Sequence, residues 1–333
     1  MIITNPEKCL ELSKQIYSYD RVLSTPAFKK LLNESFSPDS YLFFHEEDEI
    51  LPLVAKGDIC HFYGGDLPFN EFNRVPNSKK ILSKCFEFCE NHNLSLKLTS
   101  IVNDPVSLLS DSRLAYDVPY NQLWLRKNIK EFDIENFLLS FKSKKRDKLK
   151  KALALSHKFD ILEVNSNNER LDFLNNTYES INNIFENRGL VSCWKNNKNL
   201  YRKVNEYFWD NFKTINRVFT NKTTNQMEAS YTLVFNDNEI FLAFSNCYNF
   251  NIEYFQYFIY LDILKTSAFH AKNKDIELNA GRGNFSYKSR MGFTPVPMYA
   301  LVNAPDWSPK NNNDISESER VTLYGRDFGY NLS

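Results

Sequence analysis

The hydrophobic positions of this chain change period several times in its first part. Helical spacing covers residues 7–35 and is broken near Pro26. The positions that follow predict three strands, a helix and a fourth strand, in this order: 41–45, 50–55, 59–63, 78–91 and 94–98. Short turns separate the first three strands, so we expect an antiparallel meander that leads into a helix and a further strand.

The same order of elements recurs later in the chain. Two strands, a long apolar helix and a short strand are predicted at 227–235, 239–247, 253–271 and 276–278. Two helices, 134–141 and 143–157, lie between the copies, and Ser143 is the expected N-cap of the second. A last strand is expected near residues 321–324.

Two copies of one pattern predict two domains of the α/β (α+β) class. We expect an N-terminal domain over residues 1–130 and a C-terminal domain over 131–333, the second opening with entry helices in 131–157. A chain of 333 residues is long enough for two domains with a core each.

Charge and composition exclude several classes of protein. Lys plus Arg and Asp plus Glu both total 41, so no net charge attracts the chain to DNA or to an anionic membrane. No apolar run is long enough to span a bilayer, and the N-terminus lacks the pattern of a signal peptide. We therefore expect a cytoplasmic protein without a membrane span.

Metal and nucleotide motifs are missing from the sequence. Six cysteines occur without CxxC pairs, and we interpret Cys85 and Cys89 as core residues rather than half of a metal site. The histidines show no metal spacing, and the sequence has neither a P-loop nor a Gly-x-Ser-x-Gly elbow. We expect no helix directly after Gly281-x-Gly283. The sequence therefore predicts no metal and no bound cofactor.

Residues 142–151 contain seven cations and one acid on a chain of zero net charge. Such a segment is able to bind the phosphates of coenzyme A or of a tRNA end. A solvated helix face is the alternative interpretation. Residues 278–293 form the second unusual segment, because three of the nine glycines stand here beside Arg and Lys residues. A plain strand-to-loop connection explains the glycines but not the cations.

The chain resembles the FemAB-like, BioF2-like acetyltransferase family of the GNAT superfamily over about residues 40–295. The family's Asp-Phe-Gly-Arg-Gly-x-x-x-Tyr-Lys motif is matched by Gly281, Arg282, Gly283, Tyr287 and Lys288. Its basic Ser-x-Lys-x-Arg helix start is similar to residues 143–146, and its Trp region is similar to Arg188-Gly189 with Trp194. The resemblance implies tandem GNAT-like domains, each a mixed, mostly antiparallel sheet flanked by helices, and transfer of an acyl or aminoacyl group.

This sequence departs from the family at two places. Asn279 replaces the acidic residue before Gly-Arg-Gly, and residues 249–252 replace a Ser-Pro-Gly loop. The pyrophosphate-binding loop of ordinary GNAT enzymes is also missing. The donor therefore stays open between a coenzyme A thioester and an aminoacyl-tRNA, and tRNA is a candidate partner.

Direct transfer requires the enzyme to orient an amine and an acyl carbonyl, to accept a proton and to stabilise the oxyanion. We assign the oxyanion role to Lys288, which we expect to be exposed. Lys144 and Lys145 are assigned to donor phosphates. Substrate binding is assigned to the following residues: Arg146, Trp194, Tyr248, Asn279, Arg282 and Tyr287. Glu228 and Glu277 are weighed as bases, but neither is chosen.

The sequence thus predicts an N-acyltransferase that acts on an amine acceptor such as an amino acid, a peptide or a cell-wall precursor. A catalytically inactive GNAT-fold binding module is the alternative, motivated by Asn279 in place of an acid. The oligomeric state is not predicted.

Overall fold

The computed structural model describes residues 1–71, 73–103, 121–164, 166–187, 192, 194–248, 252–271, 274–281 and 285–302. The chain divides into two compact units. The first contains Met1–Leu123 and the described residues from Val296 onward, and the second contains Trp124–Pro295. No helix in these ranges is long and apolar enough to cross a membrane.

The first unit is built on one mixed sheet. Its elements are β1 (Ile2–Ile3), α1 (Pro6–Ile16), α2 (Pro26–Phe36), β2 (Ser40–Glu46), β3 (Glu49–Lys56), β4 (Ile59–Phe62), α3 (Lys79–Asn91), β5 (Ser95–Ile101) and β12 (Thr294–Val302). Strands β1 to β4 pair antiparallel in sequence order, β5 runs parallel to β4, and β12 pairs antiparallel with β5.

Local sequence explains where the helices of the first unit begin. Asn5, Thr25 and Ser78 cap α1, α2 and α3 with side chains that accept a backbone N–H, and a proline opens each of the first two helices. Helix α3 packs the buried residues Cys85 and Cys89 into the hydrophobic core formed with the sheet. The interpretation of both cysteines as core residues is confirmed.

The second unit also contains a mixed sheet. Its elements are β6 (Asn121–Arg126), α4 (Ile134–Leu139), α5 (Ser143–Leu153), β7 (Phe159–Glu163), α6 (Asn167–Glu186), α7 (Lys198–Asn211), β8 (Lys213–Asn221), β9 (Met227–Phe235), β10 (Glu239–Cys247), α8 (Phe255–Ala271), β11 (Glu277–Asn279) and α9 (Phe285–Arg290). The strand order is β6-β11-β10-β9-β8-β7, with β10 and β11 parallel and the other pairs antiparallel.

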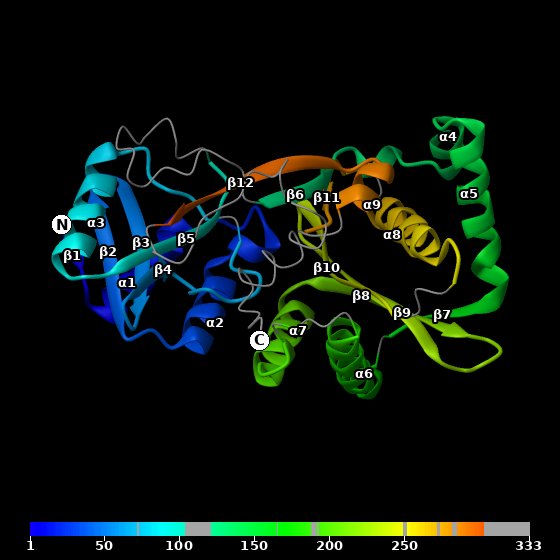
Figure 1. Ribbon diagram of the computed structural model, residues 1–333, viewed down its shortest axis with the longest axis horizontal. Helices are drawn as coiled ribbons and strands as arrows, with labels where there is room; N and C mark the ends of the chain where they lie inside the picture. The colour runs from blue at the N-terminus through cyan, green and yellow to red at the C-terminus, as the bar shows by residue number, and fades with distance from the viewer. Residues whose placement is uncertain are drawn as a thin grey trace. The chain divides into compact units, whose positions relative to one another are not determined.

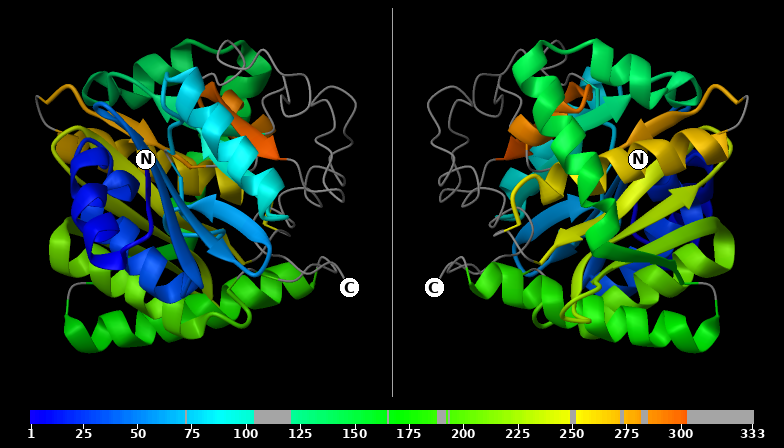
Figure 2. Two further views of the ribbon diagram at one scale, coloured as in Figure 1. Left: turned by 90° about the vertical axis from the view of Figure 1, so that its left-hand side faces the viewer. Right: turned by 90° about the vertical axis from the view of Figure 1, so that its right-hand side faces the viewer.

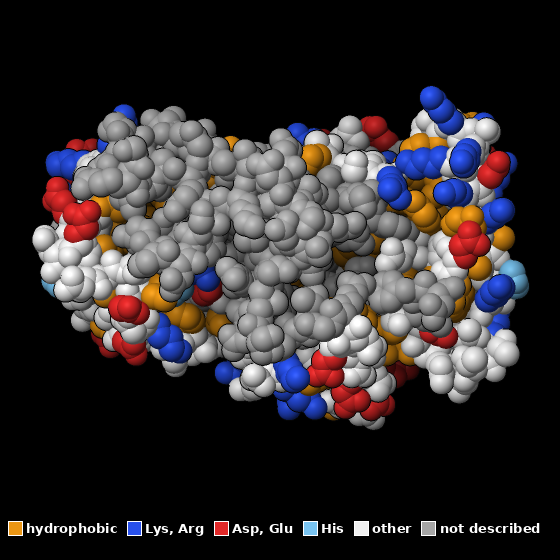
Figure 3. Space-filling model, in the orientation of Figure 1, with side chains coloured by type: hydrophobic (Ala, Val, Ile, Leu, Met, Phe, Trp, Pro, Cys, Tyr) orange, Lys and Arg blue, Asp and Glu red, His pale blue; other side chains and the backbone are white. Residues whose placement is uncertain are grey.

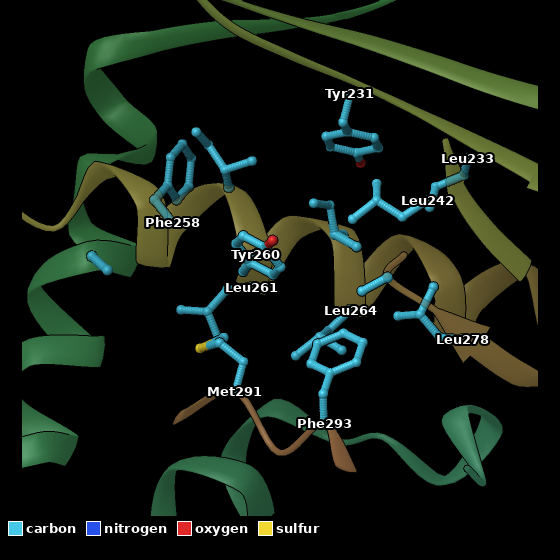
Figure 4. Close-up of a cluster of buried hydrophobic side chains, with 14 of the residues drawn as sticks. Tyr231, Leu233, Leu242, Phe258, Tyr260, Leu261, Leu264, Leu278, Met291 and Phe293 are labelled. Atoms are coloured by element: carbon cyan, nitrogen blue, oxygen red, sulfur yellow. The ribbon is translucent and has the colours of Figure 1, made fainter. Parts of the chain in front are cut away.

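Helices cover both faces of this second sheet. Helices α6 and α7 lie on one side of β8, β9 and β10, and α8 lies on the other (Figure 1). Both views in Figure 2 show α6 and α7 side by side below the strands. Most residues of helix α8 are buried, and they lie on more than one side of the helix. Figure 4 shows it between Tyr231, Leu233 and Leu242 of the sheet and Met291 and Phe293, which follow α9.

The two units repeat one topology. In each, an antiparallel meander leads through a helix to a strand that runs parallel to the last meander strand. An antiparallel strand then borders the parallel one: β12 beside β5 in the first unit, and β6 beside β11 in the second. Residues 296–302 were expected in the second domain, but they return to the first unit. Superposition of the two halves stays a prediction.

Most elements expected from hydrophobic spacing are present within a few residues of their predicted ends. Two local expectations were wrong. Ser143 is the first residue of α5 rather than its cap, because Lys142 holds the N-cap position. A helix, α9, does follow the Gly281-x-Gly283 segment. The strand expected near residues 321–324 lies outside the described residues.

Candidate active site

The second sheet opens where β10 leaves β11. Among the residues that the structure describes, the two strands pair from Glu239 to Phe241 on β10, against Glu277 to Asn279 on β11. Strand β10 continues to Cys247 and stays paired with β9 along its other edge. The register against β9 shifts between Leu242 and Phe244, directly after the last pair with β11. The candidate site is therefore centred on the part of β10 beyond this separation.

Asn279 organises the turn at the end of β11. Its side chain is fully buried, and its amide nitrogen donates to Glu239 Oε1 at 2.8 Å. Its amide oxygen accepts from the backbone N–H of Gly281, also at 2.8 Å. Only an amide can satisfy both partners, because an ionised aspartate at 279 would place a second carboxylate against buried Glu239. The departure from the family's acidic residue thus has a structural cause, and a substrate-binding role for Asn279 stays a prediction.

Lys288 lies inside the protein rather than on its surface. It comes from α9, its exposed fraction is 4%, and its Nζ donates to the carbonyl of Ala280 at 2.6 Å and of Gly281 at 3.3 Å. The expectation of an exposed lysine was wrong, because the ammonium satisfies carbonyls that would otherwise be buried without a donor. Gly281 itself has a φ of +61°, a conformation that favours glycine.

Arg282 and Gly283, which carry part of the expected motif, lie outside the described residues. Tyr287 is a residue of α9, but its side chain lies outside the described part of the chain as well. Within the motif, the structure therefore brings together Gly281 and Lys288 through the hydrogen bonds described above. The substrate-binding roles of Arg282 and Tyr287 stay predictions.

Aromatic side chains gather on the face of the sheet that α6 and α7 cover. Trp194 is 5% exposed, and its ring lies 5.2 Å from that of Tyr201 and 6.1 Å from that of Phe244, measured between centroids. Tyr201 belongs to α7 and Phe244 to β10, so this cluster joins helix and sheet. The Tyr178 hydroxyl donates to the carbonyl of Trp194 at 2.9 Å and fixes the residue further.

A polar group of side chains lies farther along the same face, near the end of β10. The Tyr248 hydroxyl is 2.5 Å from Ser230 Oγ, and burial raises the pKa of this tyrosine far above its usual range. Glu228 lies beside it, since its carbonyl accepts from the Tyr248 backbone N–H at 2.8 Å. Asn246 is the cross-strand partner of Ser230. We name Glu228, Ser230, Asn246 and Tyr248 the β9–β10 polar cluster.

Glu228 was weighed and Tyr248 was predicted from the sequence, whereas Ser230 and Asn246 were missed. The sequence does contain a signal for them. Positions 228, 230 and 232 of β9 alternate with the core residues Ala229, Tyr231 and Leu233, and all three are polar. They are nevertheless buried. A strand that buries its polar face as well as its apolar face indicates a second environment on the other side of the sheet.

The structure does not bring Lys288 and Tyr248 together. Lys288 binds the turn at Gly281, and the Phe241 ring lies on the side of Gly281 where a side chain would begin. Tyr248 follows Phe241 by seven positions of largely extended chain, which corresponds to about 23 Å at the usual rise of a strand. Trp194 and Phe244 lie between these two ends. The candidate site is thus a row of groups along β10.

Helix α5 carries the basic segment expected from the sequence. Figure 3 shows Lys and Arg side chains gathered where α4 and α5 lie in Figure 1. Lys145 donates to the carbonyl of Arg290, the last residue of α9, at 2.8 Å. Its ammonium also lies 3.6 Å from the centre of the Phe141 ring. The pKa of Lys145 is lowered, mainly by burial and to a lesser extent by the charge of Arg290. Lys144 is exposed and Arg146 is half-buried.

The contacts of Lys145 distinguish it from its two neighbours on α5. Within the described ranges, Lys144 and Arg146 make no ion pair and no side-chain hydrogen bond. Their charges stay available to a ligand. The contact between Lys145 and Arg290 joins α5 to α9, and α9 carries Lys288. The basic segment and the Gly281 turn therefore belong to one connected part of the second unit.

Solved structures share the fold of this chain at low sequence identity. The C-terminal domain of a putative lysylphosphatidylglycerol synthetase from Agrobacterium fabrum matches with a TM-score of 0.55 and 11% identity over 99% of both chains. FemX matches with a TM-score of 0.54 and 9% identity over 91% of this chain and 97% of its own. A tandem GNAT protein from the clavulanic acid biosynthesis pathway matches with a TM-score of 0.52 and 8% identity, over 92% and 99%.

No protein-family model and no curated protein sequence matches the chain. At these identities the structural matches show the fold alone. The fold is GNAT-like, with mixed sheets flanked by helices, and the predicted fold class is confirmed.

Proposed function

We propose that this protein is an N-acyltransferase that moves an acyl or aminoacyl group from an activated donor to an amine. The donor is a coenzyme A thioester or an aminoacyl-tRNA, and the acceptor is an amino acid, a peptide or a cell-wall precursor. The observation that carries the proposal is the separation of β10 from β11 in a GNAT-like sheet, with a glycine turn and buried Lys288 at its start.

The separation suits transfer chemistry for a physical reason. A strand that leaves its neighbour presents backbone N–H groups along an edge, and such donors can hold an acyl carbonyl without reorganising during the reaction. The first residues of β10 are fixed by β9 and by the Asn279–Glu239 hydrogen bond. The donor would thus be positioned by rigid elements. Lys288 would act by shaping the turn or by stabilising the oxyanion.

Helix α5 is proposed as the region that binds the donor's phosphates. Lys144 and Arg146 project charges that no described residue neutralises, on a chain of zero net charge. Both candidate donors carry phosphate, so the helix does not decide between them. The putative lysylphosphatidylglycerol synthetase is a neighbour whose name, by its lysyl group, favours the aminoacyl form.

An inactive GNAT-fold binding module is the second candidate. Asn279 favours it, because the acidic residue of the family is replaced and the amide that stands there is bound on both sides. Such a module would retain the fold and a ligand but would transfer nothing. Lys288 and the uncommitted cations of α5 favour the enzyme instead.

Ligand-observed NMR with the purified chain separates these cases. Coenzyme A, acetyl-CoA and a charged tRNA are tested in parallel, at low and moderate salt. The proposal expects one donor class to bind and to lose affinity as salt is added. Binding of neither class at any salt concentration would contradict it. A donor that binds but is never consumed in the presence of amines would instead support the inactive module.

A further inference from the structure

The β9–β10 polar cluster contains a carboxylate, that of Glu228, for which the described residues supply no partner. Glu228 is 6% exposed. Its side chain makes no hydrogen bond and no ion pair with any residue that the structure describes. Placing an ionised carboxylate in such surroundings is costly unless a cation or hydrogen-bond donors offset the lost hydration. A residue of this kind in a folded protein indicates a ligand that carries the missing charge.

Alternation along β9 places Glu228 on the polar face of the sheet, and an irregularity in the pairing with β8 falls at this residue. The pairs between β8 and β9 shift from Phe219–Ala229 to Thr220–Met227, so Glu228 is the extra residue of a β-bulge. Ala229 belongs to the apolar core under α8, whereas Glu228 lies with Ser230 toward α6 and α7. Bulges of this kind commonly redirect a side chain beside a functional site.

Asn246 supplies a second polar group with unused hydrogen-bonding capacity among the described residues. Its amide nitrogen is buried and makes no hydrogen bond within the described part of the chain, although the side chain lies beside the Tyr248 hydroxyl. Asn246 pairs across the strands with Ser230, and Glu228 is its diagonal neighbour on the same face. Diagonal neighbours in a sheet have Cβ atoms about 6–8 Å apart. A small ligand group fits between two side chains at that separation.

We infer that Glu228 and Asn246 bind an α-amino acid unit. The carboxylate pairs with the α-ammonium group, and the amide N–H₂ donates to the adjacent carbonyl or carboxylate oxygen. The Tyr248 and Ser230 hydroxyls hold each other at 2.5 Å and line the site beside the ammonium. A plain acyl group has no cation for Glu228. The site therefore favours an aminoacyl group or a free amino acid over an acetyl group as the unit that the second domain recognises.

This inference rests on the proposed function but deepens it, because it names a substrate class and the residues that select it. The amino acid unit has two sources. It belongs either to an aminoacyl donor, where the carbonyl is esterified, or to a free amino acid acceptor, where it ends in a carboxylate. An ester or amide mimics the first and the free amino acid is the second. Asn246 is able to donate to the oxygen in both.

The test is calorimetric titration of the full chain with small probes. The amides and methyl esters of the common amino acids form one arm, the free amino acids the second, and the matching carboxylic acid amides without the amino group the third. At least one amino acid probe should bind, and its counterpart without the amino group should bind at least about tenfold more weakly, as expected for loss of a charged hydrogen bond. The arm that binds better identifies the source.

Variants of matched shape locate the binding. Glu228→Gln should lower the affinity for the probe at least about tenfold. Asn246→Asp should also lower this affinity, because a carboxylate replaces the amide donor. Glu179→Gln changes an exposed carboxylate on α6 and should leave affinity unchanged. Thermal unfolding of each variant shows whether it is folded. The inference is overturned if no amino acid probe binds, if the probe without the amino group binds equally well, or if folded Glu228→Gln retains full affinity.

The outcome also distinguishes this inference from the proposed function. Transfer of an acetyl group without binding of any amino acid probe would support the enzyme and reject the site. Binding that depends on Glu228, in a protein that transfers nothing from either donor, would support the site and reject the enzyme.

Discussion

Lys288 should contribute to folding as well as to any chemistry, and Lys288→Met tests this most sharply. Methionine keeps an unbranched side chain of similar length and removes only the ammonium. The wild-type ammonium donates to the carbonyls of Ala280 and Gly281, and Ala280 is itself 5% exposed. The substitution therefore leaves at least one buried carbonyl without its donor.

Hydrogen bonds from a charged donor contribute about 1.5–3 kcal/mol each, and burying the methionine stem offsets part of their loss. We expect Lys288→Met to lower the free energy of unfolding by about 2–4 kcal/mol, as measured in urea. In a domain of this size each kcal/mol corresponds to about 2–4 °C, so Tm should fall by about 5–15 °C.

Lys265→Met is the matched control, because Lys265 lies exposed on α8. Its Tm should stay within about 1 °C of the wild type, as is usual for surface changes. If Lys288→Met is as stable as this control, the carbonyl contacts do not hold the turn and the reasoning is refuted. Once stability is known, kcat of Lys288→Ala is measured well below its Tm, where loss of an oxyanion donor predicts a decrease of about 10²–10³.

Three further predictions follow from charge and burial. The double variant Lys144→Ala with Arg146→Ala should weaken donor binding and reduce the magnitude of the slope of log K against log salt by about 1.5, as measured by fluorescence titration. An unchanged slope would show that these two residues of α5 face solvent and do not bind the donor. Asn279→Asp sets a carboxylate against buried Glu239 and should cost about 3 kcal/mol at neutral pH, with partial recovery near pH 4, where one carboxyl is protonated. Equal unfolding free energies at both pH values would contradict this. Burial lowers the pKa of His61 to about 4, so the unfolded chain, with a histidine pKa of about 6.5, takes up the proton first as the pH falls. The free energy of unfolding should therefore drop by about 2 kcal/mol from pH 7 to pH 5 on account of this residue. His61→Phe should remove that part of the drop, as measured by urea unfolding. A variant with the wild-type pH dependence would show that the ring is not held neutral.

Hydrophobic spacing was sufficient to predict the helices and strands that are buried on one face or on most of their surface. Helix α8 and strand β10 are apolar runs of the right length, and they were found nearly at their observed ends. Helix α6 was missed because its sequence is rich in Asn, Glu and Ser, and its clearest local signal is the capping box of Ser166 and Glu169. Strand β12 was missed because Pro295 and Pro297 argue against a strand.

The candidate site was less predictable than the fold because its residues are defined by partners distant in sequence. A lysine at position 288 is ordinarily a surface residue, and only the fold of the turn supplies carbonyls for its ammonium. Likewise, Asn279 is explained by Glu239, forty residues earlier. The alternation along β9 places Glu228 on the polar face, but the sequence alone does not show that this face is buried.

Transfer of a labelled group in a single turnover is the decisive test of acyl transfer by this protein. The purified chain is mixed in excess with tRNA charged with a radiolabelled amino acid, or with labelled acetyl-CoA, and a mixture of amines is added. We expect label to move from one donor into an amide that resists mild base, which cleaves the starting ester or thioester. We also expect Lys288→Ala to slow this step. Label that stays on both donors, at enzyme concentrations where a donor is bound, would contradict acyl transfer.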